Sequence, residues 1–418
     1  MHSDSESMRE LAYSAAGQDL RLFVVAGEHS GDALGARLMG ALDQGRGGRI
    51  RYLGVGGAEM AAAGLSSQFP IEEVAVMGPL AILARLPRIM RRIASTAAAA
   101  VAADPDAVVI IDSPEFTHPI ARRIRRRRPE IPIIDYVSPS VWAWRPGRAH
   151  KMRAYVDHVL ALLPFEPEAH ARLRGPPCTY VGHPLIERVG AMRGLDPTPL
   201  AQRLGLGADA QLLVVLPGSR PSEVGRLLGP FGETLQRLRQ RGRKFNVAIP
   251  VVDTVRRQVE AGVAHWPKAP HLLQGEADKF AAFRLARAAL AASGTVTLEL
   301  ALAGTPMVVA YKVDPVAAPV LRRLIKAPST VLPNLILGSR AIPEFHQEQC
   351  TPAKLANALV ALIDEGEARQ RQLKALAGVP ERMRLPRGTP SEAAAAIVLN
   401  YAEMGRGWPR PDVLRLGA

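Results

Sequence analysis

An acidic side chain stands where a parallel sheet would present it to a ligand. Asp112 directly follows the apolar run 107–111 and precedes Pro114. Ligands of such sheets bind outside the carboxyl ends of the strands, and a carboxylate placed there can accept the proton of an attacking hydroxyl. Asp112 is therefore a candidate general base. A glycosidase pair with Glu115 requires a distance that spacing alone does not establish, and a capping Asp in a tight turn is the structural alternative.

Small residues and one arginine follow two apolar runs in the second half of the chain. The motif LPGSR places Ser219 and Arg220 at the end of one run, and Gly294 and Thr295 follow another. The N–H groups of a helix N-terminus and a forked guanidinium both favour phosphate, so these four residues are candidates for binding a diphosphate. Glu299, one helical turn further on, can accept hydrogen bonds from ribose hydroxyls. A surface arginine and an ordinary helix cap are the alternatives.

The first glycine-rich segment, GEHSGDALG, follows the apolar run 20–26. Its glycines permit a tight turn and the approach of a ligand to the next helix, so Glu28, His29, Ser30 and Asp32 are candidate cleft residues. Neither the dinucleotide fingerprint nor a P-loop occurs in the chain, which removes the main support for nicotinamide, flavin or P-loop nucleotide chemistry. A plain strand-to-helix turn capped by Ser30 or Asp32 is the alternative.

The sequence contains no pattern typical of a metal site or a serine hydrolase. C-x-x-C, H-E-x-x-H and G-x-S-x-G are all absent. Asp104-Pro105-Asp106 matches the D-x-D pattern of metal-using sugar transferases, but it precedes its strand and so belongs to the wrong edge of the sheet. We therefore expect neither a metal nor a cofactor.

Two of the four tryptophans, Trp142 and Trp144, lie in the single segment SPSVWAWR. Aromatic rings over a cleft can stack on sugars, bases or acyl chains. Packing in the core is an equally good interpretation of the same residues.

Composition and charge narrow the class of protein. The chain has 418 residues, of which 48% are hydrophobic and 22% charged, a globular composition with room for two cores. Lys and Arg outnumber Asp and Glu by 53 to 39. This surplus fits nucleic acid, anionic lipid or a phosphorylated substrate, unless it reflects a high-GC genome. Only two cysteines, no signal-peptide pattern and no transmembrane run predict a cytoplasmic protein.

Short apolar runs alternate with amphipathic stretches in both halves of the chain, as in parallel sheets covered by helices. Predicted helices include 33–42 and 89–103. The predicted strands are 20–26, 52–55, 107–111, 131–136, 159–163 and 179–181, then 211–216, 245–249, 271–273, 288–292 and 307–311. The Gly- and Pro-containing segment 187–210 is predicted as a linker. We therefore expect an α/β protein with two doubly wound Rossmann-like domains facing an interdomain cleft.

One further stretch has the pattern of a basic amphipathic helix. One arc of a helical wheel carries the apolar residues Ile82, Leu83, Leu86, Ile89 and Met90. The opposite arc carries Arg85, Arg88, Arg91 and Arg92. Such a helix can lie among lipid headgroups with its apolar side down. Ordinary packing on its own domain is the alternative, and Pro87 predicts a break or kink.

Taken together, these segments resemble the lipid-A-disaccharide synthase family, from about Arg21 to about Tyr401. The resemblance rests on VAGEHSGDALGARLMGAL, GVGGAEMAAAGL, EEVAVMGPLAILARLPRI, YVSPSVWAWR, ALLPFE, YVGHPL, LPGSRPSEV, SGTVTLELALAGTPMVVAYKV and LPNLILG. It implies an inverting, metal-independent glycosyltransferase of the GT-B fold. Its expected reaction joins UDP-2,3-diacylglucosamine to 2,3-diacylglucosamine 1-phosphate (lipid X), giving a β(1→6)-linked disaccharide 1-phosphate and UDP.

The resemblance also implies roles and partners. Asp112 matches an acidic residue needed for activity, and Arg220 matches the arginine that binds the diphosphate. Glu299, Asn334 and Gln347 match positions at the UDP pocket. The expected location is the cytoplasmic face of the inner membrane, in peripheral contact with phospholipid, and dimers that exchange C-terminal segments are known in the family. His29 and Glu115 depart from the usual residues, so the resemblance assigns them no role.

The resemblance divides the chain into five expected parts. These are an N-terminal extension without order at 1–20, an acceptor- and membrane-facing domain at 21–190, a UDP-sugar domain at 191–370, a helical segment at 371–402 that crosses back or swaps, and a basic tail at 403–418. A peptidoglycan transferase or a UDP-N-acetylglucosamine 2-epimerase is the runner-up. A nucleic-acid-binding protein is disfavoured because the chain lacks helix-turn-helix and RNA-binding signatures.

Overall fold

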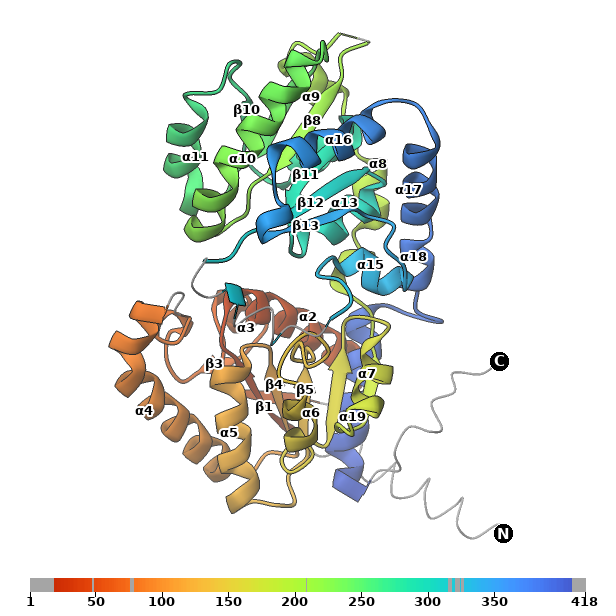
Figure 1. The fold of residues 1–418 in the computed structure, drawn as a ribbon. Coiled ribbons are helices and arrows are strands. Elements are labelled where there is room, and N and C mark those ends of the chain that lie inside the picture. The colour runs from red at the N-terminus through yellow and green to blue at the C-terminus, as the bar shows by residue number, and fades with distance from the viewer. Residues whose placement is uncertain are drawn as a thin grey trace. The chain divides into compact units, whose positions relative to one another are not determined.

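The computed structural model describes residues 19–46, 49–75, 79–207, 209–314, 318–319, 324 and 327–407, without the side chains of 79–84 and 407 (Figure 1). The predicted extension 1–20 and tail 403–418 fall mostly outside these residues. The chain forms two compact units. The first unit comprises Met1–Pro184 and Leu385–Ala418, and the second unit is Leu185–Arg384.

The first unit is built on a seven-stranded sheet with the order β3-β2-β1-β4-β5-β6-β7. Every pair of neighbouring strands is parallel. The strands are β1 (Leu20–Ala26), β2 (Ile50–Val55), β3 (Ser66–Ser67), β4 (Ala107–Ile111), β5 (Ile133–Tyr136), β6 (His158–Ala161) and β7 (Cys178–Tyr180). The central strands are apolar at nearly every position because helices cover the sheet on both faces.

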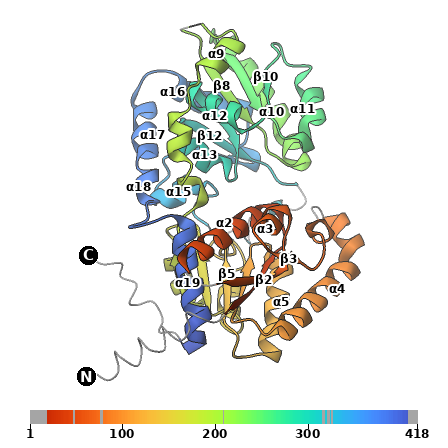
Figure 2. The same cartoon turned by 180° about the vertical axis from the view of Figure 1, so that it is seen from behind.

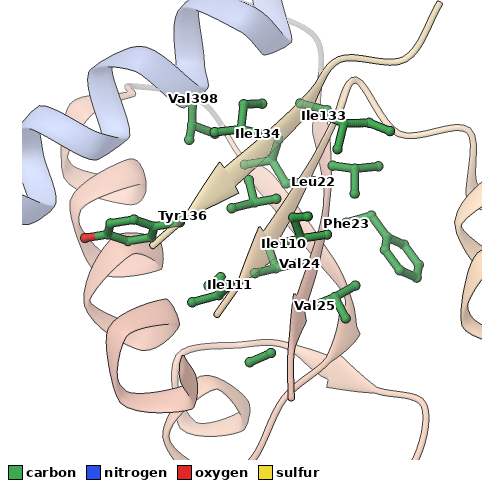
Figure 3. Packing of buried hydrophobic residues seen from close by; sticks show 14 of the residues in the cluster. Leu22, Phe23, Val24, Val25, Ile110, Ile111, Ile133, Ile134, Tyr136 and Val398 are labelled. Carbon is green, nitrogen blue, oxygen red and sulfur yellow. The ribbon is translucent and has the colours of Figure 1, made fainter. Parts of the chain in front are cut away.

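Helices connect these strands. They are α2 (His29–Gly45), α3 (Ala58–Ala62), α4 (Pro79–Ala103), α5 (Pro114–Arg127), α6 (Gly147–Met152) and α7 (Glu166–Arg172). Side chains from neighbouring strands pack together in the core, among them Leu22, Ile110 and Ile134, and Val398 from the C-terminal helix packs against them (Figure 3). The direction in which successive strands are added to the sheet reverses between β1 and β4. The loops after these two strands therefore flank the topological switch point, where doubly wound sheets bind ligands.

The C-terminal helix α19 (Pro390–Met404) belongs to the first unit although it follows the second in sequence. It lies beside α2 (Figure 2). A capping box between Thr389 and Glu392 starts the helix. Its Ile397, Val398 and Tyr401 are buried in the first unit's core, which explains why the chain returns.

The second unit has a six-stranded parallel sheet with the order β10-β9-β8-β11-β12-β13. Its strands are β8 (Leu212–Leu216), β9 (Asn246–Pro250), β10 (His271–Leu273), β11 (Ala286–Ala292), β12 (Met307–Tyr311) and β13 (Glu344–His346). Its helices include α8 (Val189–Gly194), α9 (Thr198–Arg203), α10 (Pro221–Gln240), α11 (Arg256–Val263), α12 (Glu276–Leu285), α13 (Val296–Ala303), α15 (Leu332–Leu337), α16 (Pro352–Ile363), α17 (Glu367–Ala377) and α18 (Val379–Arg382). Here the switch point lies between β8 and β11.

The predicted two-domain Rossmann-like α/β class is confirmed, with differences in detail. The unit boundary after Pro184 precedes the predicted one at 190, and the predicted segment 371–402 is shared between the units. The predicted linker 187–210 contains α8 and α9 and is part of the second unit. Helix α4 runs through Pro87 without the predicted break. Cys178 and Cys350 are both free.

Candidate functional site

A pocket of about 790 Å³ lies at the switch point of the second unit. Its lining includes Ser219 and Arg220 from the loop after β8, and Gly294 and Thr295 from the loop after β11. Glu299 of α13 completes this set. The sheet topology brings these residues together although about 75 positions separate the two loops, because β8 and β11 are neighbouring parallel strands.

The loop after β8 is held by a buried carboxylate that the sequence analysis missed. Gly218 has φ +118, a conformation that glycine adopts readily and other residues rarely adopt. The N–H of Ser219 donates to Glu223 Oε2 at 3.3 Å, and Arg220 Nη1 donates to Glu223 Oε1 at 3.1 Å. The Arg220 side chain remains 62% exposed. One of the five N–H donors of a guanidinium therefore fixes Arg220, while the group stays accessible to an anion.

The N-terminus of α13 forms the opposite wall. Thr295 is the N-cap residue, but its side chain makes no capping hydrogen bond, and Gly294 before it has φ +158. The first N–H groups of an α-helix have no partner within the helix and carry partial positive charge. In α13 the N–H groups of Thr297 and Leu298 donate to Gly294 O and Thr295 O at 3.1 and 2.9 Å. The wall thus offers a phosphate group the N–H groups that precede them, together with the positive end of the helix.

Glu299 is held by Lys279, which also lines the pocket. Lys279 Nζ lies 3.0 Å from Oε1 and 2.9 Å from Oε2 of Glu299. The lysine in turn lies 4.6 Å from the centre of the Phe280 ring. A carboxylate fixed in this way keeps lone pairs that can accept hydrogen bonds from hydroxyl groups.

Two predicted pocket residues are not among those that line the pocket. Asn334 is buried, and its amide donates to Ile342 O and accepts from Ile342 N–H, both at 2.9 Å. Gln347 Oε1 accepts from Val313 N–H at 3.1 Å. Both side chains bind backbone of the second unit, so the geometry makes them supports of the fold here and does not bring them together with Arg220.

Asp112 follows the carboxyl end of β4, as sequence reasoning expected, and the strand order places this end at the switch point of the first unit. Asp112 and Ser113 both have left-handed backbone, with φ +51 and φ +43. Two successive non-glycine residues of this kind store roughly 1–3 kcal/mol of strain each, a feature that clusters at functional sites. Asp112 Oδ1 accepts from Ser113 N–H at 2.7 Å, and Thr117 Oγ1 donates to Asp112 O at 2.8 Å. The first bond orients the carboxylate, and the second supports the backbone that carries it.

The glycine-rich loop after β1 lies against the Asp112 loop. A Cβ atom on Gly27 would lie 2.7 Å from Ser113 Cβ, so only glycine permits this approach. Glu28, His29 and Ser30 are exposed. Asp32 is instead buried, and its carboxylate accepts the N–H groups of Gly57, Glu59 and Met60 at 2.7, 3.0 and 3.1 Å. Asp32 therefore caps α3, which corrects its prediction as a cleft residue.

A buried ionisable pair lies beneath the same edge of the sheet. Asp135 on β5 is 3.2 Å from His118 Nε2, and both side chains are almost inaccessible to water. Burial raises the pKa of Asp135, the His118 contact opposes this shift, and the charge of Asp112 adds to it. The one sequence signal for this pair was an aspartate inside an otherwise apolar strand.

The two tryptophans of the loop after β5 differ in environment. Trp142 Nε1 donates to Glu166 Oε1 at 3.1 Å, and the ring meets Phe165 edge-on with centres 5.1 Å apart. Burial raises the pKa of Glu166 to about 7. Trp144 is exposed, and the guanidinium of Arg145 lies 4.3 Å from its ring centre. Trp142 is therefore half-buried and held by contacts within the first unit, whereas Trp144 is exposed.

The predicted amphipathic surface lies on α4. Leu86 and Met90 are 43% and 45% exposed, whereas Ile89 is half-buried. The side chains of Ile82 and Leu83 lie outside the described residues. In the described part of the chain, none of the helices has the length and apolarity needed to span a membrane. Among these same residues, no three His, Cys, Asp or Glu side chains gather into a group that could hold a metal ion.

Comparison with known proteins shows the family of the chain. Residues 22–398 match the family described as Lipid-A-disaccharide synthetase. The chain is 53% identical to the lipid-A-disaccharide synthase of Nitrobacter hamburgensis, over 94% of this chain and 98% of the relative. It is also 53% identical to that of Rhodopseudomonas palustris strain HaA2, over 93% and 98%.

Among solved structures, the chain resembles the UDP-GlcNAc 2-epimerase of Neisseria meningitidis bound to UDP-GlcNAc. The TM-score is 0.58 at 12% identity, over 91% of this chain and 98% of that one. At so low an identity, this likeness establishes the fold alone and carries no information about activity. The family match and the curated relatives are far more specific, and the chain belongs to the lipid-A-disaccharide synthetase family.

Proposed function

We propose that this chain catalyses the synthase reaction with Asp112 as the general base. The reaction transfers the diacylglucosamine of UDP-2,3-diacylglucosamine to the 6-hydroxyl of 2,3-diacylglucosamine 1-phosphate, with inversion at the anomeric carbon and release of UDP. Asp112 accepts the proton of that hydroxyl as the hydroxyl attacks. Its strained, hydrogen-bonded position at the switch point of the first unit is the observation that carries this assignment.

The pocket of the second unit binds the UDP group. Arg220 and the positively polarised N-terminus of α13 bind the diphosphate, and Glu299 accepts hydrogen bonds from the ribose hydroxyls. Negative charge grows on the diphosphate as the glycosidic bond breaks, so donors that already point at it lower the barrier. In this proposal these groups supply the charge stabilisation that a metal ion supplies in other sugar transferases.

The acyl chains of both substrates require access to lipid. Leu86 and Met90 on α4, together with the exposed Arg85, Arg88 and Arg91, form an apolar and basic surface suited to an anionic bilayer. This surface supports our proposal of a peripheral enzyme, and its assignment to the cytoplasmic face of the inner membrane rests on the resemblance described above. A homodimer with exchanged C-terminal segments is a further proposal, which rests on the resemblance described above.

A radiolabel assay tests the function. The purified chain is incubated with labelled UDP-diacylglucosamine, with and without lipid X, and products are separated by chromatography. We expect disaccharide 1-phosphate and UDP only when lipid X is present. Turnover of UDP-N-acetylglucosamine alone would instead indicate an epimerase, and release of UDP into water without disaccharide would indicate a hydrolase.

A further inference from the structure

Two arginines share one carboxylate beside the Asp112 loop. Arg145 Nη1 lies 3.4 Å from Glu115 Oε1, and Arg148 Nη2 makes a short contact with the same oxygen. Burial favours the neutral form of Glu115, but the hydrogen bond and charge of Arg148 and the charge of Arg145 outweigh it and lower its pKa. Two positive charges thus face one negative charge, which leaves this cluster cationic.

The cluster of Glu115, Arg145 and Arg148 has features that an ordinary surface ion pair lacks. Arg145 has left-handed backbone, with φ +52, and its guanidinium stacks on Trp144 at 4.3 Å. Arg148 is only 17% exposed, whereas its partner Glu115 is 73% exposed. Exposed ion pairs contribute little to stability, so stability does not account for a strained backbone and a half-buried arginine. Strain of this kind is typical of binding sites.

Topology places the cluster next to the proposed base. Glu115 lies in the first turn of α5, three residues after Asp112. Both arginines follow β5, whose Tyr136 pairs with Ile111 at the end of β4. Because the strands are parallel, their carboxyl ends meet at one edge of the sheet, and so do the loops that follow them.

We propose that Arg145 and Arg148 bind the 1-phosphate of the acceptor sugar and that Glu115 pairs with the two guanidinium groups until the phosphate displaces it. This subsite rests on the proposed function: in the acceptor sugar, C1 with its phosphate and C5 with its 6-hydroxymethyl group both flank the ring oxygen, so a site for the phosphate is expected near the base that serves the 6-hydroxyl. A phosphate has more charge and more acceptor oxygens than a carboxylate and matches the guanidinium fork. The exposed Glu115 side chain can move into water when it is displaced.

The test compares two acceptors, lipid X and the same diacylglucosamine without its phosphate, in mixed micelles. Arg145→Ala is the decisive variant because its exposed side chain is not needed for folding, and Arg148→Lys keeps the charge but loses the fork. We expect each to raise the KM for lipid X about 10- to 100-fold, with kcat and the donor KM unchanged. Use of the dephosphorylated acceptor should stay at its wild-type level. The control Arg126→Ala removes an exposed arginine of α5 and should change neither KM.

Glu115→Gln provides a variant with the opposite expected effect. It removes the competing charge, so the KM for lipid X should fall. Equal losses on both acceptors, a loss confined to kcat, or a wild-type enzyme that does not distinguish the acceptors would overturn the subsite. A wild-type enzyme that makes no disaccharide from either acceptor would overturn the proposed function and the subsite with it, so the two failures are distinguishable.

Discussion

Replacing Gly218 with alanine should damage the diphosphate loop although glycine contributes no side-chain contact to a ligand. Its φ of +118 is strained for any residue with a Cβ atom, at roughly 1–3 kcal/mol. The added Cβ would lie 2.5 Å from Glu223 Oε2 and 2.6 Å from Glu223 Cβ. Rotating the carboxylate relieves only the first clash, because Glu223 Cβ is fixed on helix α10. We therefore expect a total cost of at least about 2 kcal/mol.

This cost must appear as lost stability or as a displaced loop. If the loop keeps its geometry, about 2 kcal/mol lowers the Tm by roughly 4–8 °C for a domain of this size. If the loop moves instead, Ser219 and Arg220 leave the diphosphate, and kcat/KM for the UDP donor falls about 30-fold. Thermal unfolding and initial rates with varied donor measure the two outcomes on the same sample.

The matched control is Gly229→Ala on α10. An added Cβ there meets no atom within 4 Å, and alanine favours a helix over glycine by about 1 kcal/mol. This variant should keep the wild-type kcat/KM with an equal or higher Tm. A Gly218→Ala enzyme with both wild-type Tm and wild-type kcat/KM would refute the assigned role of the Glu223-supported loop.

Three further predictions concern other parts of the chain. Glu299→Ala should weaken UDP binding about 10- to 100-fold and should weaken the binding of 2′-deoxy-UDP less. Calorimetry measures both affinities, and an equal loss of affinity for the two nucleotides would contradict the ribose contact. Because burial raises the pKa of Glu166 from 4.5 to about 7, the folded protein retains a proton that the unfolded chain releases, so stability should fall as pH rises through that window. Glu166→Gln should flatten this fall in urea unfolding curves, and an unchanged slope would be the contrary result. Leu86→Ser with Met90→Ser should reduce co-sedimentation with anionic vesicles, whereas Met404→Ser, which removes an equally exposed side chain, should not.

The fold could be predicted wherever strands are short, apolar and bounded by turn residues. The predicted bounds of 20–26, 107–111, 271–273 and 307–311 agree with β1, β4, β10 and β12. The edge strands β3 and β13 could not be found in this way because their residues, Ser66–Ser67 and Glu344–His346, are polar or half-buried and have no apolar pattern. The equally short edge strands β7 and β10 could be predicted because β10 contains two leucines and β7 leads into the buried Val181, so the missing signal is the apolar pattern and not the edge position.

The site could be predicted as far as topology alone determines it. Asp112 and Arg220 each follow an apolar run, so their places at the carboxyl ends of strands could be predicted, whereas the switch points depend on the spatial strand order, which the runs do not determine. The partners that hold them could not be predicted, because they depend on tertiary contacts. In the sequence, Glu223 resembles any acidic residue in the first turn of a helix, but in the structure it supports the Arg220 loop. Asp32 resembles an acidic residue of a ligand-binding loop, but its carboxylate caps helix α3.

The central claim is that Asp112 removes the proton of the attacking hydroxyl. Asp112→Asn tests it most directly, because asparagine has the same shape, tolerates left-handed backbone and keeps an oxygen that can accept the Ser113 N–H bond. The account predicts a kcat about 100- to 10,000-fold lower, with the donor KM and the Tm near their wild-type values. A folded Asp112→Asn enzyme that retains most of its kcat would contradict it.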